Sequence, residues 1–171
     1  MFLDMTIHDF DMARYLMDSE VVEVYTSGKV LVDPVFEQAG DVDTAITILK
    51  FETGAIGTID NSRQAVYGYD QRVEVFGSEG MVTVKNNTPD NHIYLNREGT
   101  HSALPLNFFM DRYTESYLKE MEAFIDCIRN DQLPSVSGRD GLLSVIIGMA
   151  AKQSCQENRP VKLSEIYDFK N

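Results

Sequence analysis

Two titratable side chains near the start of the chain, Asp4 and His8, are spaced to act as an acid–base pair. If a helix begins near Thr6, residues four positions apart lie about one turn apart, so the carboxylate and the imidazole can face the same cavity. The imidazole has an unperturbed pKa of about 6.5, and a neighbouring carboxylate favours its protonated form and orients the ring. Such a pair suits general acid–base catalysis. A helix cap and a structural histidine are the alternative interpretations, and the spacing by itself favours them.

The segment of residues 61–72 is a second candidate site, because it is polar, contains a glycine and joins two expected strands. Its side chains include Tyr67, Tyr69, Asp70 and Arg72. Hydrogen-bonding groups beside an aromatic ring suit a polyhydroxylated ligand, since the ring can meet the apolar face of that ligand. An exposed loop between two strands explains the same composition, and the residues alone favour that simpler interpretation.

Other kinds of site lack their sequence signatures. A metal site built from Asp4, His8 and Asp9 or Asp11 has no second histidine nearby and no zinc-like spacing. The chain contains no G-x-S-x-G motif, and both of its cysteines fall within amphipathic helix patterns. It also contains no G-x-G-x-x-G or G-x-x-x-x-G-K-[ST] motif, so we expect no nucleotide-binding loop within it.

Apolar spacing predicts helices in the first and last parts of the chain and strands between them. Helices are expected over residues 6–17, where Thr6 and Asp9 form a capping box, and over residues 112–129 and 139–156. Strands are expected over residues 21–26, 29–32, 44–51, 55–61, 71–76, 81–85 and 92–96, with a turn at Ser27 and Gly28 between the first two. This order predicts a single α+β domain over residues 1–171, with an open, largely antiparallel or mixed sheet and helices packed on one face.

The chain is strongly acidic, because 27 Asp and Glu against 15 Lys and Arg give its 171 residues a net charge of -12. Such a surface repels phosphate backbones and anionic lipid head groups, so we expect neither nucleic acid nor a membrane surface as a partner. No apolar run approaches the roughly 20 residues needed to cross a bilayer, and residues 1–20 do not resemble a signal peptide. We therefore expect a cytoplasmic protein.

Several segments, in order along the chain, resemble the Gfo/Idh/MocA oxidoreductases and, within them, the inositol 2-dehydrogenases. Residues 2–16, FLDMTIHDFDMARYL, are similar to the catalytic helix of that family. The resemblance continues through residues 72–80, RVEVFGSEG, and through Arg112-Tyr113-x-x-x-Tyr117 followed by Glu120 and Phe124, and it closes with residues 134–136, 140–141 and 159–161. It covers essentially the whole chain, and the pattern of Asp4 and His8 is a fairly specific part of it.

The resemblance implies the NAD-dependent oxidation of a secondary alcohol on a cyclic polyol such as myo-inositol. In the family, the residue matching His8 is the acid/base for the substrate hydroxyl, and the residue matching Asp4 orients that histidine. Five residues are the implied or candidate substrate contacts: Thr6, Tyr67, Tyr69, Asp70 and Arg72. Another sugar or cyclic polyol is an alternative substrate.

The family's N-terminal Rossmann domain, with its glycine-rich loop and its lysine in a Glu-Lys-Pro motif, has no counterpart in the sequence. We therefore expect this chain to be the C-terminal, substrate-binding and oligomerisation half of a dehydrogenase, without NAD binding or turnover of its own. In the family, the sheet face opposite the helices makes subunit contacts, which implies a homodimer or homotetramer. A stand-alone, non-catalytic sugar-binding or oligomerisation module is the alternative from a different functional class.

Overall fold

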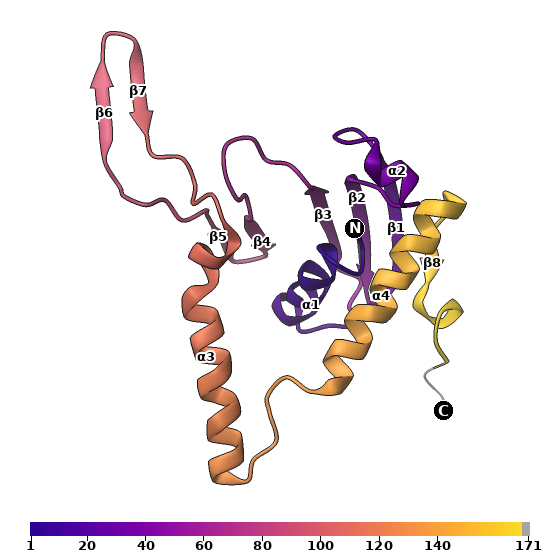
Figure 1. Cartoon of the computed structure of the whole chain (residues 1–171). Helices are drawn as coiled ribbons and strands as arrows, with labels where there is room; N and C mark the ends of the chain where they lie inside the picture. Colours follow the sequence, from indigo (N-terminus) through magenta and orange to yellow (C-terminus); the bar gives the residue numbers. More distant parts are fainter. Residues whose placement is uncertain (169–171) are drawn as a thin grey trace. The chain divides into compact units, whose positions relative to one another are not determined.

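Contacts within the chain divide it into two units in a computed structural model that describes residues 1–168. Unit 1 comprises residues 1–64 and 136–171, and unit 2 comprises residues 65–135 (Figure 1). The expected α+β class, with antiparallel strands and helices, is confirmed. The expectation of a single domain is not tested by this division and stays a prediction.

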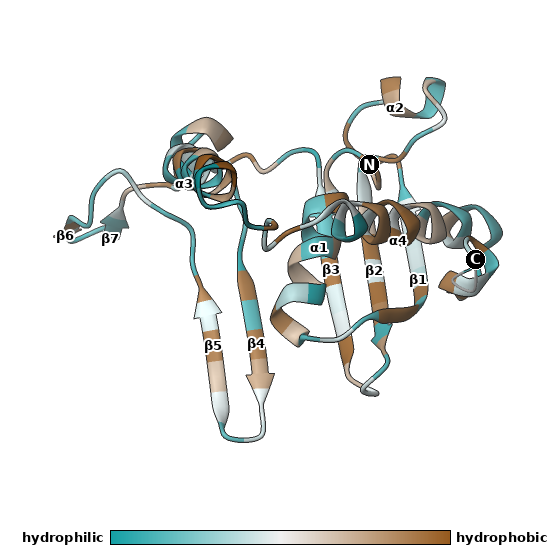
Figure 2. Ribbon diagram, turned by 90° about the horizontal axis from the view of Figure 1, so that it is seen from below, coloured by the Kyte–Doolittle hydropathy of each residue, from teal (hydrophilic) through white to brown (hydrophobic). Residues whose placement is uncertain are grey.

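Unit 1 is built around a four-stranded antiparallel sheet of order β3-β2-β1-β8. Its strands are β1 (Val21–Lys29), β2 (Thr44–Phe51), β3 (Ile56–Ser62) and β8 (Val161–Lys162). Two helices, α1 (Thr6–Met17) and α4 (Gly138–Glu157), cover one face of this sheet (Figure 2). Two short elements complete the unit: α2 (Val35–Gln38) after β1, and the 3₁₀ turn η1 (Leu163–Glu165) after β8.

The core of unit 1 follows from the alternation of side chains along β2. Ala45, Thr47, Leu49 and Phe51 are buried, whereas Ile46 between them is 58% exposed on the other face. The buried set packs with residues of both helices, among them Phe10 of α1 and Ile147 of α4, which are fully buried. The helices therefore cover one face of the sheet and leave the other face open, as the sequence predicted.

The helical face also carries buried polar side chains that join α4 to the sheet. The Thr26 N–H donates to the Ser154 hydroxyl at 2.9 Å, and this hydroxyl in turn donates to the Arg159 carbonyl at 2.6 Å. The Thr26 and Thr47 hydroxyls lie 3.1 Å apart on neighbouring strands. Because each of these polar groups has a partner, their burial does not carry the cost of an unsatisfied group.

Two local predictions in unit 1 are wrong. The turn expected at Ser27 and Gly28 does not form, because β1 continues to Lys29 in register with β2. Gly28 faces α4, where a Cβ atom would lie 3.0 Å from Cys155 Sγ, so this glycine permits close packing instead of a turn. Thr6 does not cap α1, because the N-cap position is Met5 and no side chain caps it.

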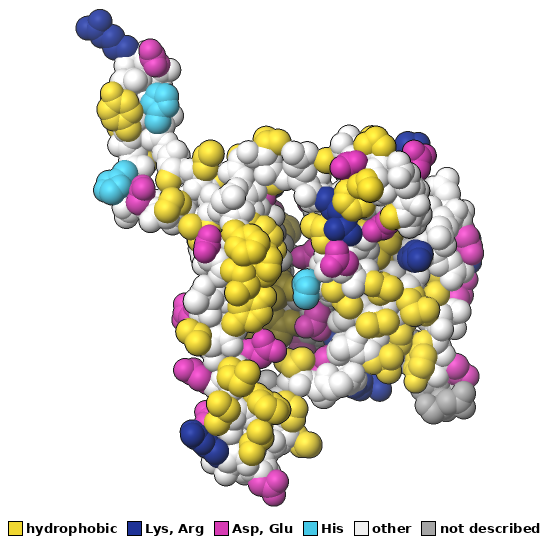
Figure 3. Space-filling view, in the orientation of Figure 1, with side chains coloured by type: hydrophobic (Ala, Val, Ile, Leu, Met, Phe, Trp, Pro, Cys, Tyr) yellow, Lys and Arg dark blue, Asp and Glu magenta, His cyan; other side chains and the backbone are white. Residues whose placement is uncertain are grey.

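Unit 2 consists of two β-hairpins and a long helix. The hairpins pair β4 (Val73–Gly77) with β5 (Gly80–Val84), and β6 (Ile93–Asn96) with β7 (Gly99–Ser102), and the helix is α3 (Phe109–Asn130). Strand β7 was not expected from the sequence. No residue of 65–135 is fully buried, and hydrophobic side chains are visible along α3 (Figure 3).

Candidate functional site

The start of α1 is anchored to the end of β3 by Asn61. The Thr6 hydroxyl donates to Asn61 Oδ1, and Asn61 Nδ2 donates to Asp9 Oδ2, both at 2.9 Å. Asn61 lies opposite buried Ala45 in the register of β2 and β3, so its side chain belongs to the helical face of the sheet. Thr6 and Asp9 flank His8 in the sequence, and their bonds therefore fix the turn of helix that carries the imidazole.

Asp4 is held by an arginine that directly follows β3. Arg63 Nη1 lies 3.0 Å from Asp4 Oδ2, and Arg63 Nη2 lies 3.4 Å from Asp41 Oδ2. The guanidinium stands over the Phe36 ring, 4.8 Å from its centroid. The side chain of Arg63 is only 21% exposed, whereas that of Asp4 is 70% exposed. The Arg63 guanidinium is thus held by Phe36 and Asp41 and contacts the exposed carboxylate of Asp4.

The two predicted catalytic residues occupy one helical segment without bonding to each other. Asp4 lies in the turn before α1, where the Met5 N–H already donates to the Met1 carbonyl at 2.9 Å, and His8 lies in the first turn of α1. His8 is exposed, and no hydrogen bond or ion pair joins its imidazole to another side chain of residues 1–168. The structure therefore provides an open imidazole on an anchored helix, and the role of Asp4 and His8 in catalysis stays a prediction.

Thr6 was expected to contact the substrate, but in the structure its hydroxyl binds Asn61. Thr6 is fully buried, and its hydroxyl is donated to Asn61. A buried, bonded hydroxyl would have to leave its partner to reach a ligand, which costs free energy. The structure therefore supports a positioning role for Thr6 rather than a contact with substrate.

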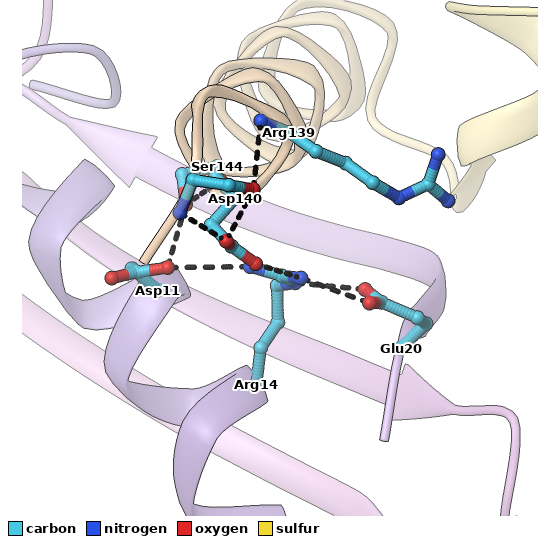
Figure 4. Close-up of polar contacts among 7 residues, drawn as sticks. Asp11, Arg14, Glu20, Arg139, Asp140 and Ser144 are labelled. Atoms are coloured by element: carbon cyan, nitrogen blue, oxygen red, sulfur yellow. Dashed lines mark hydrogen bonds and ion pairs between the residues drawn. The ribbon is translucent and has the colours of Figure 1, made fainter. Parts of the chain in front are cut away.

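The opposite end of α1 is fixed by a cluster of charges around Arg14 (Figure 4). Arg14 Nε and Nη2 contact the two carboxylate oxygens of Glu20 at 2.7 and 2.8 Å, and further contacts reach Asp11 at 3.2 Å and Asp140 at 3.3 Å. The Arg14 side chain is 9% exposed. The hydrogen bond from Arg14 lowers the pKa of the Glu20 carboxyl. This cluster ties α1 to α4 and to the segment before β1.

Within unit 2, Asp70 binds two of the other side chains singled out in the sequence, Tyr67 and Arg72. Its carboxylate accepts hydrogen bonds from the Tyr67 hydroxyl, from Arg72 Nε at 2.8 Å and from Asn86 Nδ2. Burial opposes ionisation of Asp70, but the hydrogen bonds from Tyr67, Asn86 and Arg72 lower its pKa overall. Tyr67, Asp70 and Arg72 therefore form one polar group, and their role in binding a polyol stays a prediction.

Tyr69, the remaining predicted contact in this segment, belongs to a group of aromatic side chains, although it lies between Tyr67 and Asp70 in the sequence. Its ring lies 6.1 Å from that of Tyr113 in an edge-on arrangement and 6.5 Å from that of Phe109. Its N–H donates to the Leu106 carbonyl at 2.8 Å. These contacts join the segment of residues 65–72 to the start of α3.

The sequence interpretation missed three residues that hold the predicted ones in place: Asn61, Arg63 and Asn86. Asn61 and Arg63 are two positions apart at the end of β3, so a period of two would have placed both side chains on one face. Asn86 accepts from the Gln71 N–H at 2.8 Å while it donates to Asp70. Nothing in the local sequence around Asn86 indicates that partnership.

Within residues 1–168, no group of three or more His, Cys, Asp and Glu side chains is arranged to hold a metal ion. No helix in that part of the chain is long and apolar enough to span a membrane.

Comparison with known proteins identifies the family. Residues 1–163 match the family model described as "Oxidoreductase family, C-terminal alpha/beta domain", the C-terminal domain of the Gfo/Idh/MocA oxidoreductases. The chain belongs to this family. The chain is 52% identical over 165 residues to the myo-inositol 2-dehydrogenase of Thermotoga maritima, covering 96% of this chain and 49% of that protein.

Solved structures agree with that assignment. The fold matches a crystal structure of a probable dehydrogenase from Thermotoga maritima with a TM-score of 0.95 and 51% identity, covering 97% of this chain and 50% of the other. It also matches scyllo-inositol dehydrogenase from Lactobacillus casei with bound NAD(H) and scyllo-inositol, with a TM-score of 0.87, 27% identity and coverage of 95% and 48%. The chain spans about half the length of the curated relatives it matches.

The N-terminus of α4 in this Gfo/Idh/MocA domain does not fit the diphosphate of NAD. Helix α4 begins at Gly138, but its N-terminus is closed by a capping box in which Asp140 Oδ2 accepts from the Ser137 N–H at 2.7 Å and from the Ser137 hydroxyl at 2.9 Å. A carboxylate at a helix N-terminus takes the place that a phosphate would occupy and repels it. The N-terminus of α4 is therefore not assigned to a cofactor.

Proposed function

We propose that this chain is the substrate-binding and catalytic-helix half of an NAD-dependent inositol 2-dehydrogenase, with His8 as the acid/base and Asp4 as its partner. The observation that carries the proposal is the exposed His8 imidazole on a helical turn that Asn61 anchors through Thr6 and Asp9. The substrate class rests on the myo-inositol and scyllo-inositol dehydrogenases that this chain resembles. NAD rests on the bound NAD(H) of the Lactobacillus casei enzyme and is held by the other half of the protein.

The oxidation of a secondary alcohol removes a hydride from carbon, which the nicotinamide of NAD would accept, and a proton from oxygen. We propose that residues of this chain accept the proton. A neutral His8 imidazole accepts the hydroxyl proton as the carbonyl forms, which avoids a protonated carbonyl product. The imidazolium that results is stabilised by the Asp4 carboxylate. In the reverse direction, the same imidazolium returns the proton to the alkoxide oxygen.

The polar group of unit 2 supplies the contacts to substrate hydroxyls. Tyr67 and Arg72 are donors, Asp70 is an acceptor, and Tyr69 offers a ring for the apolar face of a cyclic polyol. Tyr67 is 44% exposed and the Arg72 side chain is 65% exposed, so both can meet a ligand. We assign myo-inositol as substrate and keep another cyclic polyol as the alternative.

We also propose that the protein is a cytoplasmic homodimer or homotetramer assembled through the open face of the unit 1 sheet. Ile46 and Ile56 are 58% and 68% exposed on that face. Their replacement by lysine would place charge in the contact and lower the oligomeric state seen by analytical ultracentrifugation. An unchanged sedimentation profile for Ile46→Lys and Ile56→Lys together would contradict assembly through this face.

The catalytic assignment is tested in the full-length protein by following NADH formation with myo-inositol. His8→Gln is expected to lower kcat by about a hundredfold or more, since that is the usual contribution of a positioned acid/base. His92→Gln is the matched control, because His92 lies in unit 2, is 89% exposed and is paired with Asp90. A kcat for His8→Gln within twofold of the wild-type value would refute the role of His8.

A further inference from the structure

We infer that Arg63 is a positioning residue for the reaction, one that fixes the Asp4 carboxylate beside the turn that carries His8. This inference rests on the proposed function, because it gives Arg63 a role only through Asp4. Arg63 Nη1 lies 3.0 Å from Asp4 Oδ2, and among the described side chains no other cation reaches Asp4.

The surroundings of Arg63 hold its guanidinium still. The Arg63 N–H donates to the Asp43 carbonyl at 2.9 Å, which fixes the backbone just after β3. The guanidinium lies over Phe36 at 4.8 Å and contacts Asp41 at 3.4 Å, so an aromatic face and a second carboxylate set its direction. An arginine held this way loses little further freedom when it binds a third group.

The position of the Arg63 side chain carries a free-energy cost. Its Nε is buried and, within residues 1–168, has no hydrogen-bond partner. A buried donor without a partner destabilises the folded chain. The contact with Asp4 does not offset that cost, because Asp4 is 70% exposed and an exposed ion pair contributes little to stability. The ion pair with Asp4 therefore adds little to folding, and its effect falls on the orientation of the Asp4 carboxylate.

A comparison with Asn61 separates positioning from stability. Asn61 and Arg63 leave the same end of β3 and both bind the start of α1, but Asn61 bonds buried Thr6, whereas Arg63 bonds exposed Asp4. Loss of Asn61 leaves the buried Thr6 hydroxyl without this partner. Loss of Arg63 frees the exposed Asp4 carboxylate to rotate and removes the contacts with Asp41 and Phe36. We expect the first to lower stability and the second to lower turnover.

The test is a double-mutant cycle in the full-length protein, with kcat and KM for myo-inositol as readouts. Arg63→Gln is expected to lower kcat about tenfold, as a misplaced catalytic partner does, while KM changes less than about threefold. Arg63→Lys restores part of kcat, because its ammonium keeps the charge but not the fork of donors. In an Asp4→Asn background, Arg63→Gln has no further effect beyond about twofold, since both changes remove the same interaction.

The outcomes distinguish this inference from the proposed function. If Asp4→Asn and His8→Gln leave kcat unchanged, the proposed function fails whatever Arg63 does. If those variants lower kcat but Arg63→Gln does not, or lowers it equally in the Asp4→Asn background, the role of Arg63 is overturned and the proposed function stands. Arg159→Gln is the control, because Arg159 pairs with Glu157 and Glu165 away from Asp4.

A readout that does not depend on turnover also uses the full-length protein. The ring nitrogens of His8 are followed by NMR, with His92 and His101 as internal references in the same spectrum. Arg63→Gln is expected to shift the His8 signals and leave both references in place, while the thermal midpoint changes by only a few degrees, as for loss of an exposed ion pair. Unchanged His8 signals in a folded Arg63→Gln chain would contradict the inference, and Arg63→Lys serves if the glutamine variant does not fold.

Discussion

Each unit contains an arginine that binds a carboxylate at nearly the same distance, yet the two pairs differ in their surroundings. Arg14 Nε lies 2.7 Å from Glu20 in unit 1, and Arg72 Nε lies 2.8 Å from Asp70 in unit 2. The Arg14 side chain is 9% exposed, whereas that of Arg72 is 65% exposed. The carboxylates have the reverse exposure, 41% for Glu20 and 12% for Asp70, so the buried member of the pair is the cation in unit 1 and the anion in unit 2. Equal geometry therefore leaves the guanidinium donors accessible in unit 2 and not in unit 1.

The same contrast extends to apolar side chains. Every fully buried hydrophobic residue of the described chain belongs to unit 1, in the cluster that joins α1, the sheet and α4. Unit 2 depends on hairpin pairing, the Asp70 group and the aromatic contacts of Tyr69. Unit 1 carries the predicted acid/base, and unit 2 carries the predicted polyol contacts.

The largest expected effect compares one phenylalanine from each unit. Phe10 is fully buried in unit 1 and Phe76 is 83% exposed in unit 2. Phe10→Ala is expected to lower the free energy of unfolding by about 3–5 kcal/mol because it leaves a cavity. Phe76→Ala is expected to change it by less than about 0.5 kcal/mol. Urea unfolding followed by circular dichroism measures both, and equal losses would show that Phe76 is covered in solution.

A second comparison removes the two arginines. Arg14→Met leaves the carboxylates of Glu20, Asp140 and Asp11 without their shared cation. We expect the free energy of unfolding to fall by about 2 kcal/mol. The loss is not larger because Glu20 and Asp140 keep some contact with water. Arg72→Met is expected to cost less than about 1 kcal/mol. The same unfolding experiment decides, and a stable Arg14→Met variant would mean that the cluster does not hold α1 to α4.

The elements that the sequence predicts well are those set by local pattern. Alternation over residues 44–51 and 55–61 predicts β2 and β3 because neighbouring strands and their turn are contiguous in the chain. The patterns at residues 112–129 and 139–156 likewise predict α3 and α4 within a few residues. Asp4 and His8 attract notice because they are four residues apart.

The elements that the sequence misses depend on distant partners. Ser27 and Gly28 are typical turn residues, but Gly28 is needed for close packing against Cys155, which lies more than a hundred residues later in the chain. Thr6 looks like a helix cap, but Asn61 takes its hydroxyl. Arg63 looks like part of a polar loop, and only the fold brings it to Asp4. Contacts between residues far apart in the sequence decide these roles, and a single sequence does not reveal such contacts.

A third prediction concerns the loss of stability at low pH through Asp43. Burial alone would raise the pKa of Asp43, but bonds from the Leu31, Val32 and Asp33 N–H groups and the Thr44 hydroxyl lower it to about 2, from 3.8 for an ordinary aspartate. Because the folded state has the lower pKa, the stabilisation is fully present above about pH 4 and is lost as the pH falls toward about 2.

Asp43→Asn is the variant that tests this acid dependence. It is expected to be less stable at neutral pH and to lose less of its remaining stability between about pH 4 and pH 2 than the wild type. Asp70→Asn is the counterpart in unit 2, where the lowered pKa predicts the same sign in a more exposed setting. Urea midpoints across this range measure both, and an Asp43→Asn curve parallel to that of the wild type would contradict the assignment.

The smallest expected effect compares two glycines with positive φ. Gly68 in unit 2 has φ +132°, and a Cβ atom there would lie 2.7 Å from the Pro105 carbonyl oxygen, whereas Gly54 in unit 1 has φ +85° and open space. Gly54→Ala carries backbone strain alone, about 1 kcal/mol. Gly68→Ala must also move residues 105–106 and break the bond from the Tyr69 N–H to Leu106. Hydrogen exchange at Tyr69 therefore accelerates in Gly68→Ala and not in Gly54→Ala, and KM for the polyol rises only in the former because Tyr67 and Asp70 flank the displaced turn. Unchanged exchange at Tyr69 would mean that unit 2 yields at this turn without cost, and its exposed contacts would then be set by the ligand instead of the fold.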